Sequence, residues 1–388
     1  MTQPIVQFGT SRFLLAHADL FVADALEGRA QADQALGGIT LVQTTANPGS
    51  AARVAALASG DGYPVVIRGL ENGVSVDRTV RGTAIREALQ AVRPEHWQSL
   101  RAGMARGDVR VVLSNTADKG YVLNEQDDAS ALAPQAAAPA SYPAKLLVLL
   151  HDRWQGAAQE PLTLLPCELI ERNGEVLLGV VTSLAAQWNL PEEFRTWLSS
   201  HCVWANSLVD RIVSEAIEPV GAVAEPYALW AIEAQPGLTL PCSHPCIVVT
   251  DDLDRFEQLK LFLLNAAHTY LAECWLRQQR PANETVREAM QDPALRADLE
   301  ALWNEEILPV FGATGTPQHQ EAEQYVVDVR ERFLNPFLNH RIADIAQNHG
   351  QKKQRRLAPV VAMAESLSLS IPQARLRQAL AHDEANAA

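Results

Sequence analysis

The order of apolar and polar residues in the first part of the chain predicts strands that alternate with helices. Residues 5–8 form a short apolar run that stops at Gly9, and residues 14–26 then repeat apolar side chains at helical spacing. The β-branched run at residues 39–45 predicts a second strand. A strand, a tight turn and a helix ahead of a second strand is how a dinucleotide-binding α/β domain begins.

Later segments continue the alternation up to about residue 250. Further strands are predicted at residues 65–68, 74–77, 109–115 and 162–169, and a further helix at residues 176–187. Glu71, Asn72 and Gly73 between two of these strands indicate a hairpin turn. The Ala-, Pro- and Ser-rich stretch at residues 127–142 is expected to be a surface loop.

From about residue 251 the pattern becomes helical. Helices are predicted at residues 254–279, 284–307, 321–333, 357–367 and 373–381. We therefore expect an α/β fold with a Rossmann-type dinucleotide-binding domain at residues 1–250. A mainly α-helical substrate or catalytic domain is expected to follow at residues 251–388.

Composition and charge narrow the choice of partners. The 388 residues carry a formal net charge of −14, which argues against a general binder of nucleic acid or of an anionic membrane surface. No apolar run reaches the roughly 18–20 residues of a membrane span, and the N-terminus has no signal-peptide pattern. Five scattered cysteines fit a reducing compartment, so we expect a cytoplasmic protein.

The turn after the first strand is the candidate dinucleotide site. A glycine there allows backbone N–H groups to approach a pyrophosphate, although the full fingerprint has three glycines and an ordinary turn fits this one equally well. The position of the strand at the very N-terminus favours the nucleotide. The second strand ends without a carboxylate, so the pattern leaves NAD and NADP open. The candidate cofactor-binding residues are Gly9, Thr10, Ser11, Arg12, Phe13 and Asn115.

The strongest local feature is a polar trio on an apolar helix. In an α-helix, Asn265 lies about 140° and His268 about 80° from Lys260, so all three share one side. The surrounding residues are apolar nearly all the way round, which predicts burial. A buried lysine suits general acid/base chemistry. In the simpler alternative, Lys260 reaches solvent while Asn265 and His268 form hydrogen bonds within the core.

Three further clusters contain polar residues. Asp210 and Arg211, close to Asn206, fit a structural ion pair. Arg332 could hold a carboxylate through two hydrogen bonds, or simply be solvated. Cys242, His244 and Cys246 have no second ligand pair elsewhere, so no metal site is expected.

These segments together resemble the polyol-specific long-chain dehydrogenases/reductases, the mannitol dehydrogenase family, over nearly the whole chain. The resemblance rests on segments that occur in family order, at residues 7–13, 114–116, 166–170, 206–212, 260–268 and 332–336. The Lys-x4-Asn-x2-His spacing and the Val-Asp-Arg-Ile segment are its most specific parts. Within the family, Pro166-Cys-Glu-Leu-Ile170 is most like tagaturonate reductases (altronate oxidoreductases), because Leu169 stands where mannitol dehydrogenases have an asparagine.

The resemblance implies a metal-independent oxidoreductase that uses NAD, with NADP not excluded. It makes Lys260 the acid/base, with Asn265 and His268 holding the reacting oxygen. From the resemblance we also assign five residues to the substrate site: Asn206, Asp210, Arg211, Arg332 and His340. The implied substrate is a small sugar acid of the tagaturonate/altronate type. A mannitol-like polyol 2-dehydrogenase, a fructuronate reductase and a non-catalytic sensor are the alternatives, and the oligomeric state stays open.

Overall fold

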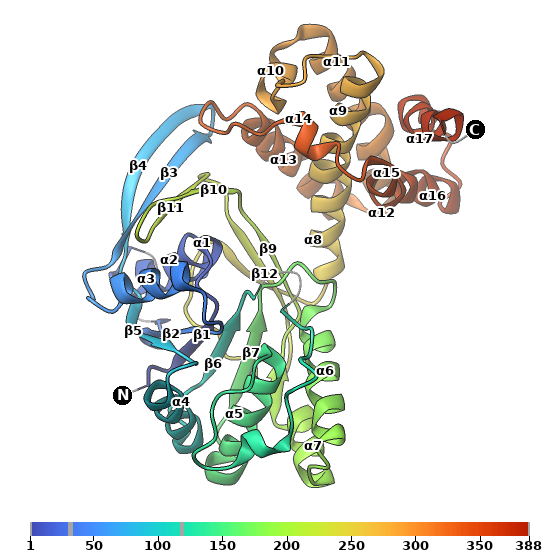
Figure 1. Cartoon of the computed structure of the whole chain (residues 1–388). Helices are drawn as coiled ribbons and strands as arrows, with labels where there is room; N and C mark the ends of the chain where they lie inside the picture. Colours follow the sequence, from blue (N-terminus) through green and yellow to red (C-terminus); the bar gives the residue numbers. More distant parts are fainter. Residues whose placement is uncertain (1, 30–33, 117–119, 387–388) are drawn as a thin grey trace. The chain divides into compact units, whose positions relative to one another are not determined.

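The computed structural model describes residues 2–29, 34–116 and 120–386 (Figure 1). The described residues form two compact units, which we treat separately. The N-terminal unit contains Met1–Ile67, Arg78–Ala224 and Ala228–Leu253, and the C-terminal unit contains Arg68–Asp77, Glu225–Tyr227 and Asp254–Ala388. The assignment of a cofactor domain to residues 1–250 and a substrate domain to residues 251–388 stays a prediction.

A parallel sheet of six strands is the centre of the N-terminal unit, as the Rossmann-type prediction requires. Its strand order is β5-β2-β1-β6-β7-β8. The strands are β1 (Ile5–Phe8), β2 (Ile39–Gln43), β5 (Ile85–Gln90), β6 (Val111–Ser114), β7 (Leu162–Pro166) and β8 (Cys202–Trp204). The chain builds outward from β1 in one direction through β2 and in the other through β6, so the sheet has its topological switch point between β1 and β6.

Alternate side chains of the sheet enter two separate cores. Val6, Phe8 and Val42 pack with one set of helices, and Ile5 and Leu41 face the other set. The first set is α4 (Pro94–Arg106), α5 (Tyr142–Ala157), α6 (Asn173–Gln187) and α7 (Glu192–Ser200). The second set is α1 (Arg12–Leu15), α2 (Ala18–Leu26) and α3 (Pro48–Leu57). The predicted loop at residues 127–142 contains only a short 3₁₀ helix, η2 (Ala129–Leu132).

Two smaller sheets were not predicted. One has the order β10-β11-β3-β4 and the other the order β13-β12-β9. Their strands are β3 (Tyr63–Glu71), β4 (Val74–Gly82), β9 (Ser207–Asp210), β10 (Val213–Ala216), β11 (Ala222–Ala224), β12 (Leu229–Glu233) and β13 (Ile247–Thr250). The hairpin between β3 and β4 is as predicted, with Asn72 and Gly73 both at positive φ. The others are only three to five residues long, too short for an alternation to stand out.

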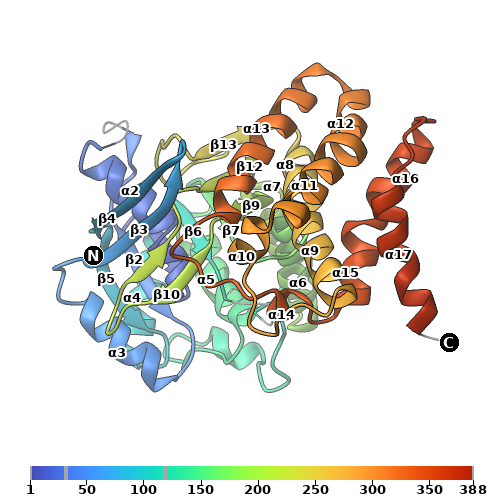
Figure 2. The same cartoon turned by 90° about the horizontal axis from the view of Figure 1, so that it is seen from above.

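Helices make up the C-terminal part of the chain, as predicted (Figure 2). They are α8 (Leu253–Leu259), η3 (Lys260–Asn265), α9 (Ala266–Arg277), α10 (Val286–Gln291), α11 (Pro293–Ala301), η4 (Leu302–Ile307), α12 (Leu308–Thr314), α13 (Thr316–Phe333), α14 (Ile342–Ile345), α15 (His349–Arg356), α16 (Ala358–Ser366) and α17 (Ala374–Asn386). Among the described helices none is long and apolar enough to cross a membrane. A cytoplasmic location stays a prediction.

Candidate active site

Gly9 lies at the switch point of the parallel sheet. Its N–H donates to the Val42 carbonyl on β2 at 3.1 Å, and its φ is +111°. A Cβ atom at this position would lie 2.4 Å from the carbonyl oxygen of Asn115, at the end of β6. Only a glycine therefore fits here, and it lets the ends of β1 and β6 approach closely, where ligands of open α/β sheets bind.

The rest of the predicted dinucleotide turn is held from several sides. The carbonyl of Thr10 accepts a hydrogen bond from Arg53 Nη1 at 2.8 Å, and Ser11 caps α1 through the Leu14 N–H. The Phe13 ring stacks on His17 at 4.8 Å. Arg12 is exposed. The turn is thus ordered and has an exposed cation, which fits an anionic ligand such as a pyrophosphate.

Asn115 is fixed against the turn. Its N–H donates to the Phe8 carbonyl at 3.0 Å and its side-chain amide donates to the Cys167 carbonyl at 2.8 Å. At the end of β2, the buried Gln43 binds the Asn47 carbonyl and accepts from Gln90. These hydrogen bonds of Gln43 involve no carboxylate, and the sequence has none at the end of β2.

The helix that contains Lys260 and Asn265 is a π-helix over Lys260–Asn265, a departure from the α-helix assumed in the sequence analysis. The Ala266 N–H donates to the Leu261 carbonyl, five residues back. The wider turn of a π-helix reduces the angle between Lys260 and Asn265 below the roughly 140° of an α-helix, so the two residues lie nearer to the same face. Lys260 is half-buried, and not fully buried as the apolar surroundings predicted.

Aromatic rings fix the imidazole of His268. This side chain is only 6% exposed and stacks on the Phe333 ring at 4.2 Å, while His340 meets it edge-on at 4.8 Å. Burial lowers the pKa of His340 and so favours the neutral imidazole. The structure thus brings His268 and His340 together, although they are distant in the sequence.

Trp303 supports the π-helix from a neighbouring segment. Its ring is fully buried, and its indole N–H donates to the Leu263 carbonyl at 3.1 Å, inside the π-helix. The same ring contacts Phe333 with centroids 6.1 Å apart. Trp303 therefore touches both the backbone between Lys260 and Asn265 and the ring on which His268 stacks. The sequence analysis missed it, since one more apolar residue in a helical pattern has no distinguishing signal.

Arg332 is paired with a protein carboxylate. Its Nε lies 3.1 Å from Glu225 Oε2 and its Nη2 lies 2.9 Å from Glu225 Oε1. Both side chains are buried, and the guanidinium lies 4.5 Å from the centroid of the Tyr227 ring. The predicted contact of Arg332 with a substrate carboxylate stays a prediction, but the two-pronged geometry is already used by Glu225. Nothing near Arg332 in the sequence points to Glu225.

Asn206, Asp210 and Arg211 lie in the N-terminal unit and make structural contacts there. The Asn206 side-chain oxygen accepts from the Gly174 and Glu175 N–H groups at the start of α6, at 3.0 and 3.1 Å. Asp210 is buried at the end of β9. Arg211 Nη1 donates to the Ala16 carbonyl at 2.6 Å, directly after α1. Their assignment to the substrate site stays a prediction.

A buried carboxyl, Asp19, lies behind the dinucleotide turn. It is fully buried in α2 and accepts a hydrogen bond from the Gln7 side chain on β1 at 3.1 Å. Burial raises its pKa to about 7. The signal that could have found it is a single charged residue within the apolar run at residues 14–22.

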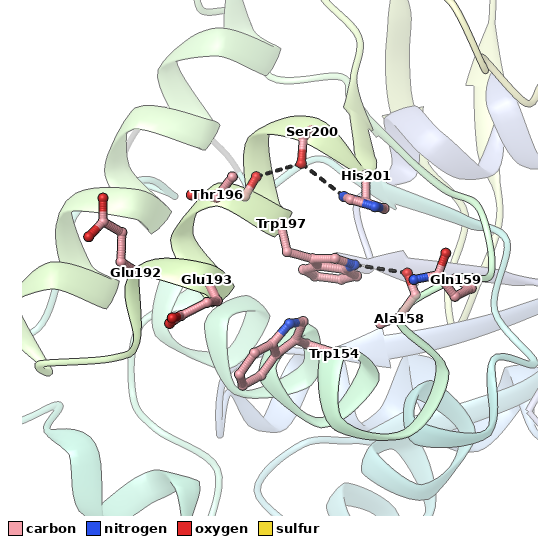
Figure 3. Close-up of a pocket in the computed structure, with 9 residues that line it drawn as sticks. All are labelled: Trp154, Ala158, Gln159, Glu192, Glu193, Thr196, Trp197, Ser200 and His201. Carbon is pink, nitrogen blue, oxygen red and sulfur yellow. Dashed lines mark hydrogen bonds between the residues drawn. The ribbon is translucent and has the colours of Figure 1, made fainter.

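A surface pocket of about 510 Å³ lies on α5 and α7, and none of the residues that line it is a predicted site residue (Figure 3). The buried Trp197 lies beside Trp154, while Glu192 and Glu193 stand at the rim. Within the described part of the chain no cluster of His, Cys, Asp and Glu side chains could hold a metal ion. Independence from metals stays a prediction.

The parallel sheet, its switch point and the glycine located there define a Rossmann-type dinucleotide-binding protein. The model of the mannitol dehydrogenase Rossmann domain matches residues 3–239, and that of the mannitol dehydrogenase C-terminal domain matches residues 252–382. The chain therefore belongs to the mannitol dehydrogenase family, which confirms the resemblance seen in the sequence.

Among relatives, the altronate oxidoreductase of Klebsiella pneumoniae is 30% identical over 97% of this chain and 78% of its own length. That of Halalkalibacterium halodurans is 33% identical over 76% of this chain, which spans only 59% of that enzyme.

Two solved structures have the same fold. D-sorbitol dehydrogenase in substrate-free form has a TM-score of 0.78 at 22% identity, over 95% of this chain and 78% of its own. The second is mannitol 2-dehydrogenase of Pseudomonas fluorescens in a ternary complex with NAD and D-mannitol. It has a TM-score of 0.69 at 20% identity, over 98% of this chain and 79% of its own.

Proposed function

We propose that this protein is an NAD-dependent oxidoreductase that interconverts a keto-sugar acid and its alcohol, of the tagaturonate/altronate type. The observation that carries the proposal is the match to altronate oxidoreductases along 97% of the chain at 30% identity. Pro166-Cys-Glu-Leu-Ile170 supports the same branch of the family.

In this proposal, the cofactor binds to the domain at residues 1–250. Gly9 and Asn115 meet at the switch point, and the close approach of their backbones suits a dinucleotide. The exposed Arg12 adds positive charge beside the turn. NAD is proposed by analogy with the complex described for the Pseudomonas enzyme. Since Gln43 replaces an acidic residue at the end of β2, the test includes both cofactors.

The acid/base chemistry is assigned to residues 251–388. The Lys260 ammonium donates a proton to the alkoxide oxygen that develops during reduction, and the neutral amine takes the hydroxyl proton during oxidation. Asn265 and His268 stabilise the charge on the same oxygen. The π-helix supports this role for Asn265 by bringing it toward the face of Lys260. The hydride is what the nicotinamide supplies when bound.

His340 is the substrate-binding residue with the most structural support. Its ring contacts the His268 ring at 4.8 Å, and as a neutral imidazole it can both donate and accept hydrogen bonds. Such a group suits sugar hydroxyls. The remaining assignments, Asn206, Asp210, Arg211 and Arg332, rest on the resemblance alone.

A mannitol-like polyol 2-dehydrogenase is the second candidate, and one observation favours it. Glu225 already neutralises Arg332, so this arginine has less need of a substrate carboxylate than the sequence suggested. A neutral polyol would not compete with Glu225.

The test is a substrate panel with purified protein. Tagaturonate, fructuronate, fructose and sorbose are each offered with NADH and with NADPH, and cofactor consumption is followed. The proposal predicts the highest kcat/KM for tagaturonate with NADH. A kcat/KM for fructose equal to that of the best uronate would replace the sugar-acid proposal by the polyol candidate.

A further inference from the structure

Glu168 is a buried carboxylate with four hydrogen-bond donors around it. Its side chain lies directly after β7 and is 3% exposed. It accepts from Ser114 Oγ at 3.0 Å, from the Thr116 N–H and hydroxyl at 2.9 Å each, and from Tyr121 Oη at 3.2 Å. Both carboxylate oxygens are therefore satisfied by neutral donors, as a buried charge requires.

These donors surround the residue that closes the switch point. Ser114 and Thr116 stand on either side of Asn115, whose carbonyl lies against Gly9. The Asn115 side chain donates to the carbonyl of Cys167, the neighbour of Glu168. The last residue of β6 and the two residues after it are thus all hydrogen-bonded to the segment after β7.

The hydroxyl donors are suited to a permanent acceptor. Burial, and then the charge of Glu168, raise the pKa of Tyr121, so its hydroxyl stays protonated. The Tyr121 hydroxyl also lies 3.2 Å from the Asn173 carbonyl, and the Asn173 amide donates to the Pro166 and Glu168 carbonyls at 3.1 Å each. The backbone that contains Glu168 is therefore itself fixed.

We propose that Glu168 is a positioning residue of the dinucleotide site: by holding Ser114 and Thr116 it fixes Asn115 at the switch point between β1 and β6. Glu168 does not touch the cofactor itself. The inference rests on the proposed function, because it requires that a dinucleotide binds at this switch point. A glutamine in its place keeps an oxygen for the Thr116 donors, but its NH2 group then faces the Ser114 and Tyr121 hydroxyls, which lose the charged acceptor to which both donate.

The test compares Glu168→Gln with Glu125→Gln, an exposed glutamate in the connection that follows β6, and with wild type. NADH binding is measured without substrate by tryptophan fluorescence, together with Tm, kcat and both KM values. We expect the Kd and KM for NADH of Glu168→Gln to rise roughly 10-fold or more, with kcat at saturating NADH and the KM for the keto-sugar within about 3-fold of wild type. Glu125→Gln should match wild type.

Three outcomes separate the inference from the proposed function. Unchanged NADH affinity in a folded Glu168→Gln, or a loss of kcat and Tm at unchanged Kd, overturns the positioning role and leaves the oxidoreductase proposal intact. Absence of NADH and NADPH binding by wild type overturns the proposed function itself. Should Glu168→Gln not fold, Thr116→Val removes one of the four donors at similar volume. A Kd for NADH raised about 3-fold in that variant supports the inference, and an unchanged Kd overturns it.

Discussion

Gly9 and Asp19, the first at the switch point and the second in α2 against β1, have different physical reasons for their identity. Gly9 is required by backbone geometry, since its φ is +111° and the Asn115 oxygen leaves no room for a Cβ atom. Asp19 is tolerated in spite of its environment, since a fully buried carboxyl stays largely protonated up to neutral pH. Both are consequences of packing β1 closely against its neighbours.

Gly9→Ala should abolish tight dinucleotide binding. The new methyl group would lie 2.4 Å from the Asn115 oxygen, so β1 and β6 must separate at the site. We expect the Kd for NADH to rise more than about 10-fold and the Tm to fall. The matched control is Gly179→Ala on α6, where a Cβ meets nothing within 4 Å. It should stabilise the protein by about 0.5–1 kcal/mol without changing the Kd. Equal NADH affinity in both variants would contradict the account.

Asp19→Asn should change how stability depends on pH. The pKa of Asp19 is raised from 3.8 to about 7 in the folded protein, so the folded state holds the proton more tightly than the unfolded chain. The contribution of the Asp19 proton to the free energy of unfolding is fully present below about pH 4 and is lost as the pH rises through about 7. An asparagine removes this loss and can still bind Gln7. The Tm difference between pH 5 and pH 8 should therefore be smaller in Asp19→Asn, and parallel curves for the two proteins would refute the assignment.

At the scale of elements, the helix from Leu253 to Arg277 is interrupted by the π-helix that contains the proposed acid/base. The Trp303 indole N–H donates a hydrogen bond to the Leu263 carbonyl inside this segment. The second π-helix, Leu302–Ile307, supplies this tryptophan. A side chain of one π-helix is thus hydrogen-bonded to the backbone of the other.

Trp303→Phe tests this arrangement, because phenylalanine keeps a large aromatic ring and removes the N–H donor. The Leu263 carbonyl then loses the indole hydrogen bond, at a cost of about 0.5–1.5 kcal/mol. Since the carbonyl lies between Lys260 and Asn265, we expect kcat to fall while the KM for NADH is unchanged. Trp275→Phe is the control, because its indole N–H donates to the Pro281 carbonyl, which lies after α9 and outside the π-helix. A kcat that falls equally in both variants would remove the special role of Trp303.

At the scale of the whole molecule, the C-terminal unit is discontinuous in sequence. It contains Arg68–Asp77 and Glu225–Tyr227 besides the helices that follow Asp254. The partner of Arg332 is Glu225, which lies outside the C-terminal segment. The helices of the C-terminal segment therefore contain a buried charge whose partner comes from another part of the sequence.

A fragment of residues 254–388 should consequently fold poorly. Arg332 is 4% exposed and would be left without Glu225, and breaking a buried pair costs about 3–5 kcal/mol. Thermal unfolding followed by circular dichroism should show no cooperative transition at temperatures where the full chain is folded. Arg332→Met in the same fragment should restore part of the transition. A fragment that melts cooperatively near the Tm of the full chain would show that Glu225 is dispensable.

Local patterns predicted the elements that define the fold, and geometry between distant segments supplied the rest. The strands β1, β2, β6 and β7 are visible as apolar runs because both faces of the sheet are buried. Lys260, Asn265 and His268 follow from one short motif. Glu225, Trp303 and Phe333 do not, since each acts on a residue at least 40 positions away through a contact that only the folded chain creates. The π-helix was equally invisible, because its sequence fits an α-helix.

The most direct test of the central claim is the turnover of Lys260→Ala with NADH and the best keto-sugar acid, beside its NADH affinity. General acid/base groups contribute about 10²–10⁴-fold, and Lys260 lies in a different unit from the dinucleotide turn. The account predicts that kcat falls by at least about 100-fold while the Kd for NADH stays within about 3-fold of wild type. A variant that keeps more than about a tenth of the wild-type kcat leaves less than ~1.4 kcal/mol for the lysine and contradicts its role as the acid/base.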